Sequence, residues 1–359
     1  MWRETSRSVE VTGAKHVKES HKGLLVFIAR RIALLAVVML GVSVIAFTVS
    51  RVAVPDPTRA WAGPRASQST IDALIVKFHL HDPIYVQFYY YLSGLLHGDW
   101  GFDPSTGQPV LASILLYLPA TMELTAAALL IVIAVGIPLG VAAATHRNKV
   151  EDHLSRIAAL TGVASPPFVV ALLLQLVFYY YLRVFPDSGG RISPLIEAPA
   201  RVTGFLIFDS ILAGNGPALV SALQHIIMPA VALGFLNLGL MSRLVRASML
   251  ESLASDYVRT AKAKGVRRML VVYKHALRNA LIQPVTVLSV YVAYMLGGSI
   301  VIESIFDWPG LGYYAAQAVF NFNLPAVMGV TLIFAIGVVV VNLAADILYA
   351  LLDPRIRLG

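Results

Sequence analysis

DYVRTAKAKG at residues 256–265 and YKHALRNA at residues 273–280 form the one highly charged stretch in the second half of a 359-residue chain. Ser255 and Asp256 offer side-chain oxygens that can cap the start of a helix. Gly265 follows at the position where a residue in the left-handed conformation ends a helix. The pattern therefore predicts a short capped helix held between two membrane spans.

The same stretch has a small apolar face. Tyr257, Val258 and Ala261 fall on one side of the predicted helix at helical spacing. A short helix of this kind suits docking into a groove on another protein. The competing interpretation is an ordinary cytoplasmic loop, because such loops in membrane proteins are generally basic and can contain a helix.

The composition places the chain in a lipid bilayer. It is 57% hydrophobic and 13% charged, with a mean hydropathy of +0.73, whereas a soluble domain is about a quarter charged. The net charge of +8 does not indicate nucleic acid as a partner, because the charges lie in loops on one side of the predicted spans. Cysteine is absent, which excludes disulfides, thiol ligands and a thiol nucleophile.

Six apolar runs are long enough to cross a hydrocarbon core of roughly 30 Å, which predicts an all-α membrane protein with six transmembrane helices. We expect the spans at about 32–54, 119–145, 157–185, 226–244, 281–301 and 325–351. Pro138 interrupts the second run, and Pro166 and Pro167 interrupt the third. Each proline removes one backbone hydrogen bond, so kinks are expected there.

The distribution of basic residues predicts the orientation. Of the 28 Lys and Arg residues, 21 lie in residues 1–31, 146–156, 243–278 and 353–359. The positive-inside rule then places both termini of a multi-pass cell-membrane protein in the cytoplasm. We divide the chain into a cytoplasmic extension (1–23), a first transmembrane region (24–54), an extracytoplasmic region (55–117) and a five-helix core (118–359) that carries the cytoplasmic loop 246–280.

Two external segments have further features. Residues 83–96 include Tyr85, Phe88, Tyr89 and Tyr90 and predict an amphipathic helix near the lipid headgroups, where aromatic side chains are favoured. Residues 186–225 are polar and rich in Pro and Gly, which predicts a long external insertion. Its role stays open between contact with a partner protein and a loop without a part in recognition.

Polar residues inside the spans are candidates for functional or structural contacts. They are Glu123, Gln175, Asn237, Asn342 and Asp346. Glu123 lies close to the outer end of its span, where its side chain can reach the headgroups. We favour structural pairing between helices over substrate contact for this group.

The order of residues in the charged stretch resembles the EAA coupling loop of ATP-binding-cassette import permeases, in the version carried by dipeptide and oligopeptide permeases. The matching positions are Arg259, Thr260, Ala261 and Gly265, followed by His275, Ala276, Leu277, Arg278 and Asn279. Arg259 and Thr260 replace the Glu-Ala opening of the general motif, and Arg278 stands at its Pro position. Those departures are typical of the peptide-permease branch.

Further stretches extend the resemblance over residues from about 24 to 359. ESIFDWPGLG at residues 303–312 is similar to the family's external E-x-x-F-x-W-P-G-x-G segment; the carried-over positions are Glu303, Asp307, Trp308, Pro309 and Gly310. We expect a short re-entrant or gate-side element, with Trp308 as an anchor at the membrane interface. HGDWG at 97–101 and LDPRIRLG at 352–359 also resemble peptide permeases.

The resemblance implies the type I import-permease fold and a transmembrane subunit of an ATP-driven importer, of di- or oligopeptides. Nickel complexes, glutathione and sugars stay open as cargo, because related permeases carry them. The implied partners are a second homologous permease subunit, two ATP-binding-cassette ATPase subunits and an extracytoplasmic solute-binding protein. The residues implied in coupling to the ATPases are Asp256, Tyr257, Arg259, Thr260, Ala261, Lys264, Gly265, His275 and Arg278.

The sequence contains no G-x-x-x-x-G-K-[ST] phosphate-binding loop. We therefore expect ATP and Mg to bind the partner subunits, and no cofactor or metal in this chain. The main alternative is a gradient-driven secondary transporter, which needs a buried ionisable relay and often has inverted repeats; the buried acids are few and no clear repeat is seen. A membrane-embedded enzyme lacks a recognisable nucleophile or metal set.

Overall fold

The computed structural model describes all residues except 1–29, 31, 50, 52–66, 78 and 353–359. The predicted N-terminal extension and the C-terminal tail with its family resemblance therefore lie outside the described residues. In the described part, five helices are long and apolar enough to cross a membrane, and one bent helix pair can form a sixth span. The predicted all-α architecture is confirmed.

The first half of the described chain contains three spans and an intervening segment. After the apolar helix Ile32–Val49 come α3 (Gln68–Lys77), α4 (Ile84–Leu96), the antiparallel pair β1 (Phe102–Asp103) and β2 (Gln108–Pro109), α5 (Val110–Ile131), the π-helix η1 (Val132–Gly136), α6 (Ile137–Thr145), α7 (Val150–Ala164), α8 (Pro167–Leu174) and the π-helix η2 (Gln175–Tyr181). The helix expected over residues 83–96 is thus present as α4.

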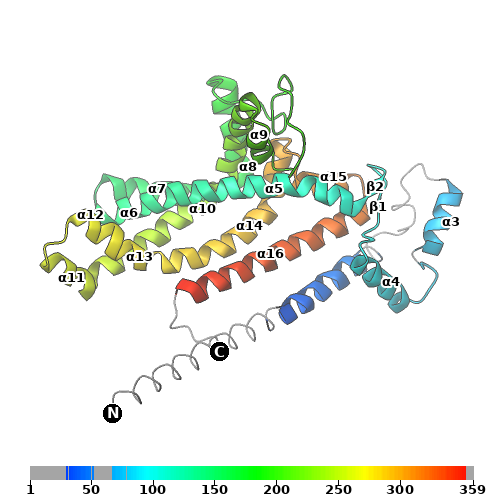
Figure 1. The fold of residues 1–359 in the computed structure, drawn as a ribbon, viewed down its shortest axis with the longest axis horizontal. Coiled ribbons are helices and arrows are strands. Elements are labelled where there is room, and N and C mark those ends of the chain that lie inside the picture. Colours follow the sequence, from blue (N-terminus) through cyan, green and yellow to red (C-terminus); the bar gives the residue numbers. More distant parts are fainter. Residues whose placement is uncertain (1–29, 31, 50, 52–66, 78, 353–359) are drawn as a thin grey trace, which may run out of the picture.

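The second half contains the remaining three spans. Its elements are α9 (Leu206–Leu212), α10 (Gly216–Ala254), α11 (Asp256–Ala263), α12 (Arg268–Leu270), the π-helix η3 (Val271–Ala276), α13 (Leu277–Ala280), α14 (Ile282–Ile305), α15 (Leu311–Phe320) and α16 (Leu324–Leu352). In Figure 1, α11, α12 and α13 lie at one end of the molecule, and the β1–β2 hairpin lies at the other. We call these the α11 end and the hairpin end.

The second span begins at Val110, earlier than the sequence pattern indicated. The backbone N–H of Val110 donates to the carbonyl of Gly101 at 3.0 Å, so the hairpin leads directly into α5. Pro119, expected near the start of the span, lies inside α5. The expected break near Pro138 takes the form of η1, because a proline has no N–H for the preceding turn and a wider π-turn accommodates the loss.

The third span is broken at its proline pair. Ser165 adopts an extended conformation, as expected for a residue before proline. The segments Ser155–Gly162 and Pro167–Tyr181 meet at 110°. In Figure 1, α7 follows the long direction of the molecule, whereas α8 turns away from it.

Helix α10 is the centre of the packing, with α5, α6, α7, α8, α9 and α14 all in contact with it. Small residues allow these close approaches, as is usual between membrane helices. A Cβ atom at Gly140 in α6 would lie 2.6 Å from Val245 Cβ and 2.7 Å from the carbonyl oxygen of Ser242. A Cβ at Gly239 in α10 would lie 2.9 Å from Ala159 Cα.

We predict that Gly140→Ala destabilises the protein by about 1–3 kcal/mol, because the added methyl group has no space between α6 and α10. Gly297→Ala in α14 is the matched control, since a Cβ at Gly297 meets no heavy atom within 4 Å. That change should be neutral or stabilise by up to about 1 kcal/mol, the helix preference of alanine over glycine. Unfolding of the purified chain in nanodiscs measures both; equal effects would contradict the packing described.

Candidate functional site

Residues 256–280, the coupling segment, connect α10 to α14 at the α11 end. The predicted left-handed conformation of Gly265 is confirmed, with φ at +73°. The N–H of Val266 donates to the carbonyl of Ala261 at 3.2 Å, which ends α11. The predicted side-chain cap is not observed, because the hydroxyl of Ser255 donates backward to the carbonyl of Ser252.

The expectation that the apolar face of α11 docks into another protein is wrong for two of its three residues, Val258 and Ala261. Val258 is fully buried and Ala261 is 7% exposed, and both belong to the main hydrophobic core together with Val271 and Val272 of η3. Tyr257 is 42% exposed. Because α11 packs against α10 and η3, its apolar residues stabilise the protein's own body and the polar residues face outward.

Five exposed residues of α11 and its C-terminal end form what we call the coupling surface: Asp256, Tyr257, Arg259, Thr260 and Lys264. The side chains of Asp256 and Arg259 are 96% and 74% exposed and form a 3.5 Å ion pair. An exposed pair at this distance contributes little stability, so both groups are available to a partner. Farther along the segment, His275 is half-buried and Arg278 is exposed.

An ion-pair cluster that the sequence pattern did not reveal fixes the helix leading into the coupling segment. Asp152 is fully buried and joins Arg246 of α10 at 2.6 Å and Arg156 at 2.7 Å. The Arg246 guanidinium, followed by that of Arg156, holds the pKa of the Asp152 carboxyl far below its usual range. Asp152 therefore stays ionised and ties α7 to α10.

The second group of expected residues lies toward the hairpin end, in the turn between α14 and α15. Glu303 is fully buried. Its carboxylate accepts a hydrogen bond from the Thr121 hydroxyl at 2.7 Å and another from the N–H of Tyr313 at 2.9 Å. The Thr121 oxygen in turn accepts from the N–H of Leu311 at 2.7 Å. One hydroxyl group of α5 thus joins the end of α14 to the start of α15.

The turn between Glu303 and Leu311 is a buried element. Trp308 is 1% exposed, and its indole N–H donates to the carbonyl of Ala120 at 2.9 Å. The expectation that Trp308 anchors the segment at the membrane interface is therefore wrong, because the protein itself encloses the ring. A Cβ at Gly310 would lie 2.5 Å from Glu303 Oε2 and from Thr121 Oγ1, so this position requires glycine.

The remaining expected residues of this turn lie nearer the surface. Asp307 is exposed and has φ at +47°, and Pro309 is half-buried. The turn and the coupling surface lie toward opposite ends of the molecule (Figure 1). The expected coupling residues and the expected residues of the Trp308 turn therefore lie in separate places and do not form one site.

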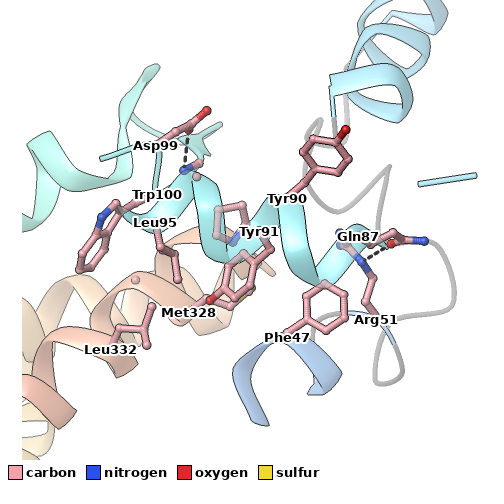
Figure 2. A pocket seen from close by; sticks show the side chains of 14 residues that line it. Phe47, Arg51, Gln87, Tyr90, Tyr91, Leu95, Asp99, Trp100, Met328 and Leu332 are labelled. Atoms are coloured by element: carbon pink, nitrogen blue, oxygen red, sulfur yellow. Dashed lines mark hydrogen bonds between the residues drawn. The ribbon is translucent and has the colours of Figure 1, made fainter. Parts of the chain in front are cut away.

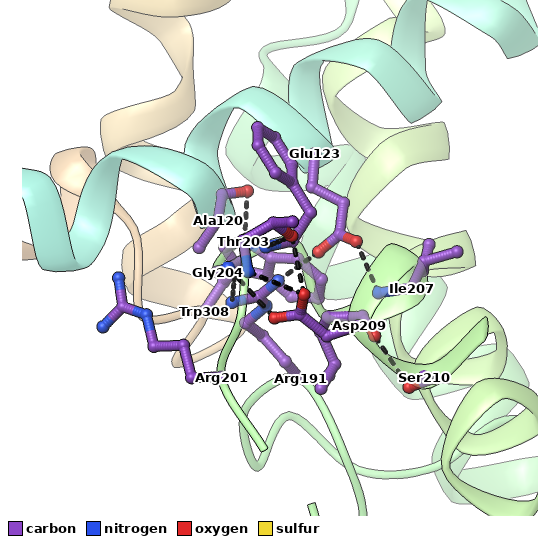
Figure 3. Close-up of polar contacts among 12 residues, drawn as sticks. Ala120, Glu123, Arg191, Arg201, Thr203, Gly204, Ile207, Asp209, Ser210 and Trp308 are labelled. Atoms are coloured by element: carbon purple, nitrogen blue, oxygen red, sulfur yellow. Dashed lines mark hydrogen bonds and ion pairs between the residues drawn. The ribbon is translucent and has the colours of Figure 1, made fainter. Parts of the chain in front are cut away.

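Residues 182–215, the connecting segment, fold against the same part of α5 (Figure 3). Glu123 is ion-paired with Arg191 and accepts a hydrogen bond from the N–H of Ile207 at 2.8 Å. The Arg191 guanidinium lies 5.7 Å from the Trp308 ring centroid. Glu123 thus pairs within the protein, as we favoured, and does not extend to the headgroups.

A carboxylate within the connecting segment holds its own turn. Asp209 accepts hydrogen bonds from the N–H and hydroxyl of Thr203 at 2.8 and 2.7 Å, and from the N–H of Gly204 at 3.0 Å. Burial tends to raise the pKa of Asp209, but these hydrogen bonds lower it below its usual value. No local sequence pattern marks Arg191 or Asp209 as partners, because their contacts arise only from the tertiary fold.

The described part of the chain contains no group of three or more His, Asp or Glu residues that could hold a metal ion. What the geometry offers is an exposed polar surface on the segment joining two spans, and a buried, fully hydrogen-bonded turn toward the other end. The exposed surface is accessible to a partner, whereas the turn is enclosed by the protein.

Two family models match the chain. Residues 136–358 match the binding-protein-dependent transport system inner membrane component, and residues 24–125 match the N-terminal part of the membrane component of such systems. Together these matches include the coupling segment, the Trp308 turn and all of α10, α14 and α15.

Individual proteins match over nearly the whole chain. A probable D,D-dipeptide transport system permease protein of Escherichia coli is 42% identical, over 90% of this chain and 95% of that protein. A dipeptide transport system permease protein of Alkalihalophilus pseudofirmus is 36% identical, over 93% and 100%. A glutathione transport system permease protein of Salmonella typhimurium is 32% identical, over 93% and 99%.

We predict that Thr121→Val destabilises the protein by about 1–3 kcal/mol, because it removes one hydrogen bond from the buried Glu303 carboxylate and takes away the acceptor of the N–H of Leu311. Thr125→Val, on the same helix, is the control. Thr125 is also buried, and its hydroxyl has no hydrogen-bond partner in the described part of the structure. Its replacement should be neutral or stabilising. Unfolding in nanodiscs distinguishes the two, and equal losses would refute the assigned role of Thr121.

Proposed function

The chain belongs to the family of binding-protein-dependent transport system inner-membrane components, and we propose that it forms half of a translocation pore for di- and oligopeptides, with residues 256–280 as the contact to ATPase subunits. It is the membrane permease subunit of an ATP-driven importer and not itself an enzyme. The gradient-driven alternative is not favoured, because the family consists of binding-protein-dependent systems.

The observation that carries the coupling role is the way the coupling segment is built into the molecule. It joins α10 directly to α14, and its inward residues Val258 and Ala261 share one core with both neighbouring regions. A force applied to the exposed side of α11 is therefore passed to two spans. ATP-driven closure of the partner ATPases would bias the pore between inward- and outward-facing states.

The coupling surface supplies the chemistry for this contact. Asp256, Arg259 and Lys264 present both charge signs, and Tyr257 adds an exposed aromatic ring. Tyrosine and arginine are enriched in the energetically important parts of protein interfaces. His275 and Arg278 extend the contact along η3 and α13. Ala261 is not part of the exposed surface, and it contributes by packing α11 against the core.

The family implies the remaining partners. We infer a second homologous permease that completes the pore, two ATP-binding-cassette ATPases that bind ATP and Mg, and an extracytoplasmic solute-binding protein. The ATPases lie in the cytoplasm, so the α11 end and both termini face that side, in keeping with the basic residues of the coupling segment.

The proposed cargo rests on the names of the relatives. The matched permeases are named for D,D-dipeptide, dipeptide and glutathione transport, and glutathione is itself a short peptide. Short peptides are therefore the cargo class we assign.

The turn around Trp308 would form a gate-side element of the pore, since its buried contacts join α5, α14 and the connecting segment.

We predict that Gly265→Val uncouples ATP hydrolysis from peptide uptake. The φ of +73° is strained by about 1–3 kcal/mol for a β-branched residue, so the end of α11 must shift. A Cβ at this position meets no heavy atom within 4 Å, so the protein should still insert. Uptake by the complete transporter in proteoliposomes should fall roughly tenfold while ATPase activity persists.

The control for this experiment is Gly107→Val. Gly107 has a similar φ of +68° and the same open surroundings, but it lies in the β1–β2 hairpin, far from the coupling segment. Its replacement should leave the ratio of uptake to ATP hydrolysis unchanged. Normal uptake by Gly265→Val, or equal loss in both variants, would refute the coupling role.

A further inference from the structure

A cavity of about 140 Å³ lies where the end of the first span, α4 and the start of α16 meet. Most of its lining is apolar or aromatic: Phe47, Tyr91, Leu95, Trp100, Met328 and Leu332. Arg51 lies at one end of this lining, and Trp100 and Leu332 lie at the other (Figure 2). None of the described residues that line the cavity belongs to the coupling segment or to the Trp308 turn.

The guanidinium of Arg51 is held in place by neighbouring residues. Its Nε donates to Gln87 Oε1 at 2.9 Å. The amide nitrogen of Gln87 in turn donates to the carbonyls of Leu80 at 3.1 Å and Asp82 at 2.9 Å. Arg51 Cζ also lies 5.0 Å from the Phe47 ring centroid, a cation–π distance. A fixed cation thus faces the cavity.

Tyr91 adds a second donor. Its hydroxyl oxygen is buried and has no hydrogen-bond partner in the part of the chain that the structure describes. Burial raises the pKa of Tyr91 to about 12, and the nearby Arg51 guanidinium opposes part of this rise, so the group remains a neutral O–H donor at physiological pH. A buried hydroxyl without an acceptor costs about 1–3 kcal/mol, which favours an acceptor brought by a ligand.

The surroundings are those of a membrane interface. Tyr85 and Tyr89 of α4 are 72% and 68% exposed, as is typical of aromatic residues at the headgroups. The first span exposes Val37 and Ile45 at 66% and 65%, a surface that belongs in hydrocarbon. The donors of Arg51 and Tyr91 therefore lie beside apolar surface. A phospholipid has the same arrangement, with a polar headgroup beside apolar acyl chains.

The acidic lining residue lies away from the donors. Asp99 is at the Trp100 end of the cavity, where its Oδ1 accepts from the N–H of Gly101 at 3.1 Å. An anion beside Arg51 would thus be separated from this carboxylate by the aromatic lining. The Arg51 end suits an anionic group, because a guanidinium is a cation with several hydrogen-bond donors.

We propose that this cavity binds one membrane phospholipid with an anionic headgroup, whose phosphate accepts hydrogen bonds from Arg51 and Tyr91. Arginine suits phosphate because its planar guanidinium presents several donors. An acyl chain lies along Leu95, Met328 and Leu332 and continues into the bilayer. The bound lipid would tie the first span and α4 to α16. This inference is independent of the cargo proposed above.

The test is native mass spectrometry of the complete, delipidated transporter titrated with phosphatidylglycerol or phosphatidylcholine. The unmodified protein should retain phosphatidylglycerol preferentially. Arg51→Gln should weaken that binding roughly tenfold, and Tyr91→Phe roughly threefold or more, as expected for charge-assisted hydrogen bonds. Tyr91→Phe keeps the aromatic packing and therefore serves if Arg51→Gln fails to fold.

Two exposed positions provide matched controls, Arg183→Gln and Tyr85→Phe. Neither should change lipid binding. Unchanged phosphatidylglycerol binding in Tyr91→Phe and in folded Arg51→Gln would overturn the proposal, as would equal losses in the controls. A further experiment adds inorganic phosphate without lipid. Phosphate binding as tight as that of phosphatidylglycerol would assign the site to a free anion and refute the proposed role of the apolar lining.

Discussion

Backbone that leaves the helical path in a buried part of a protein must find its hydrogen-bond partners within the protein. The turn between α14 and α15 satisfies this constraint through the Thr121 hydroxyl, which donates to the Glu303 carboxylate and accepts from the N–H of Leu311. Through this one hydroxyl group, α5 contacts both the end of α14 and the start of α15. Trp308 then packs beneath Arg191, whose partner is Glu123. The conformation of the connecting segment thus depends on contacts made through α5.

The structure of the α11 end depends instead on the close packing of helices. Gly140 and Gly239 allow α6 and α7 to approach α10, and Asp152 links α7 to α10 through Arg246. Because α10 continues into α11 after Ser255, the position of the coupling surface follows from these contacts. A long, tightly packed helix is a physical basis for transmitting movement, in keeping with the proposed coupling role.

Local rules explain what the sequence predicts well. Long apolar runs define the spans, Pro166 and Pro167 define the sharp bend, and Gly265 takes the left-handed conformation that ends α11. The failures concern tertiary contacts. Helical spacing placed Val258 and Ala261 on one face without saying what covers it, and composition could not distinguish a tryptophan enclosed by protein from one at the headgroups. The Glu123–Arg191 pair joins residues 68 positions apart, and no local pattern reveals such a pair.

The inward orientation of Val258 and Ala261 has a consequence for assembly. Since their burial against the core already orders α11, the helix would not have to fold on contact with the proposed ATPase partner, and little conformational entropy would be lost. The surface offered to the partner is largely charged. Complementary charges accelerate encounter and select the correct partner more than they raise affinity. For the proposed contact with an ATPase, such a surface implies an encounter rate that falls as the salt concentration rises.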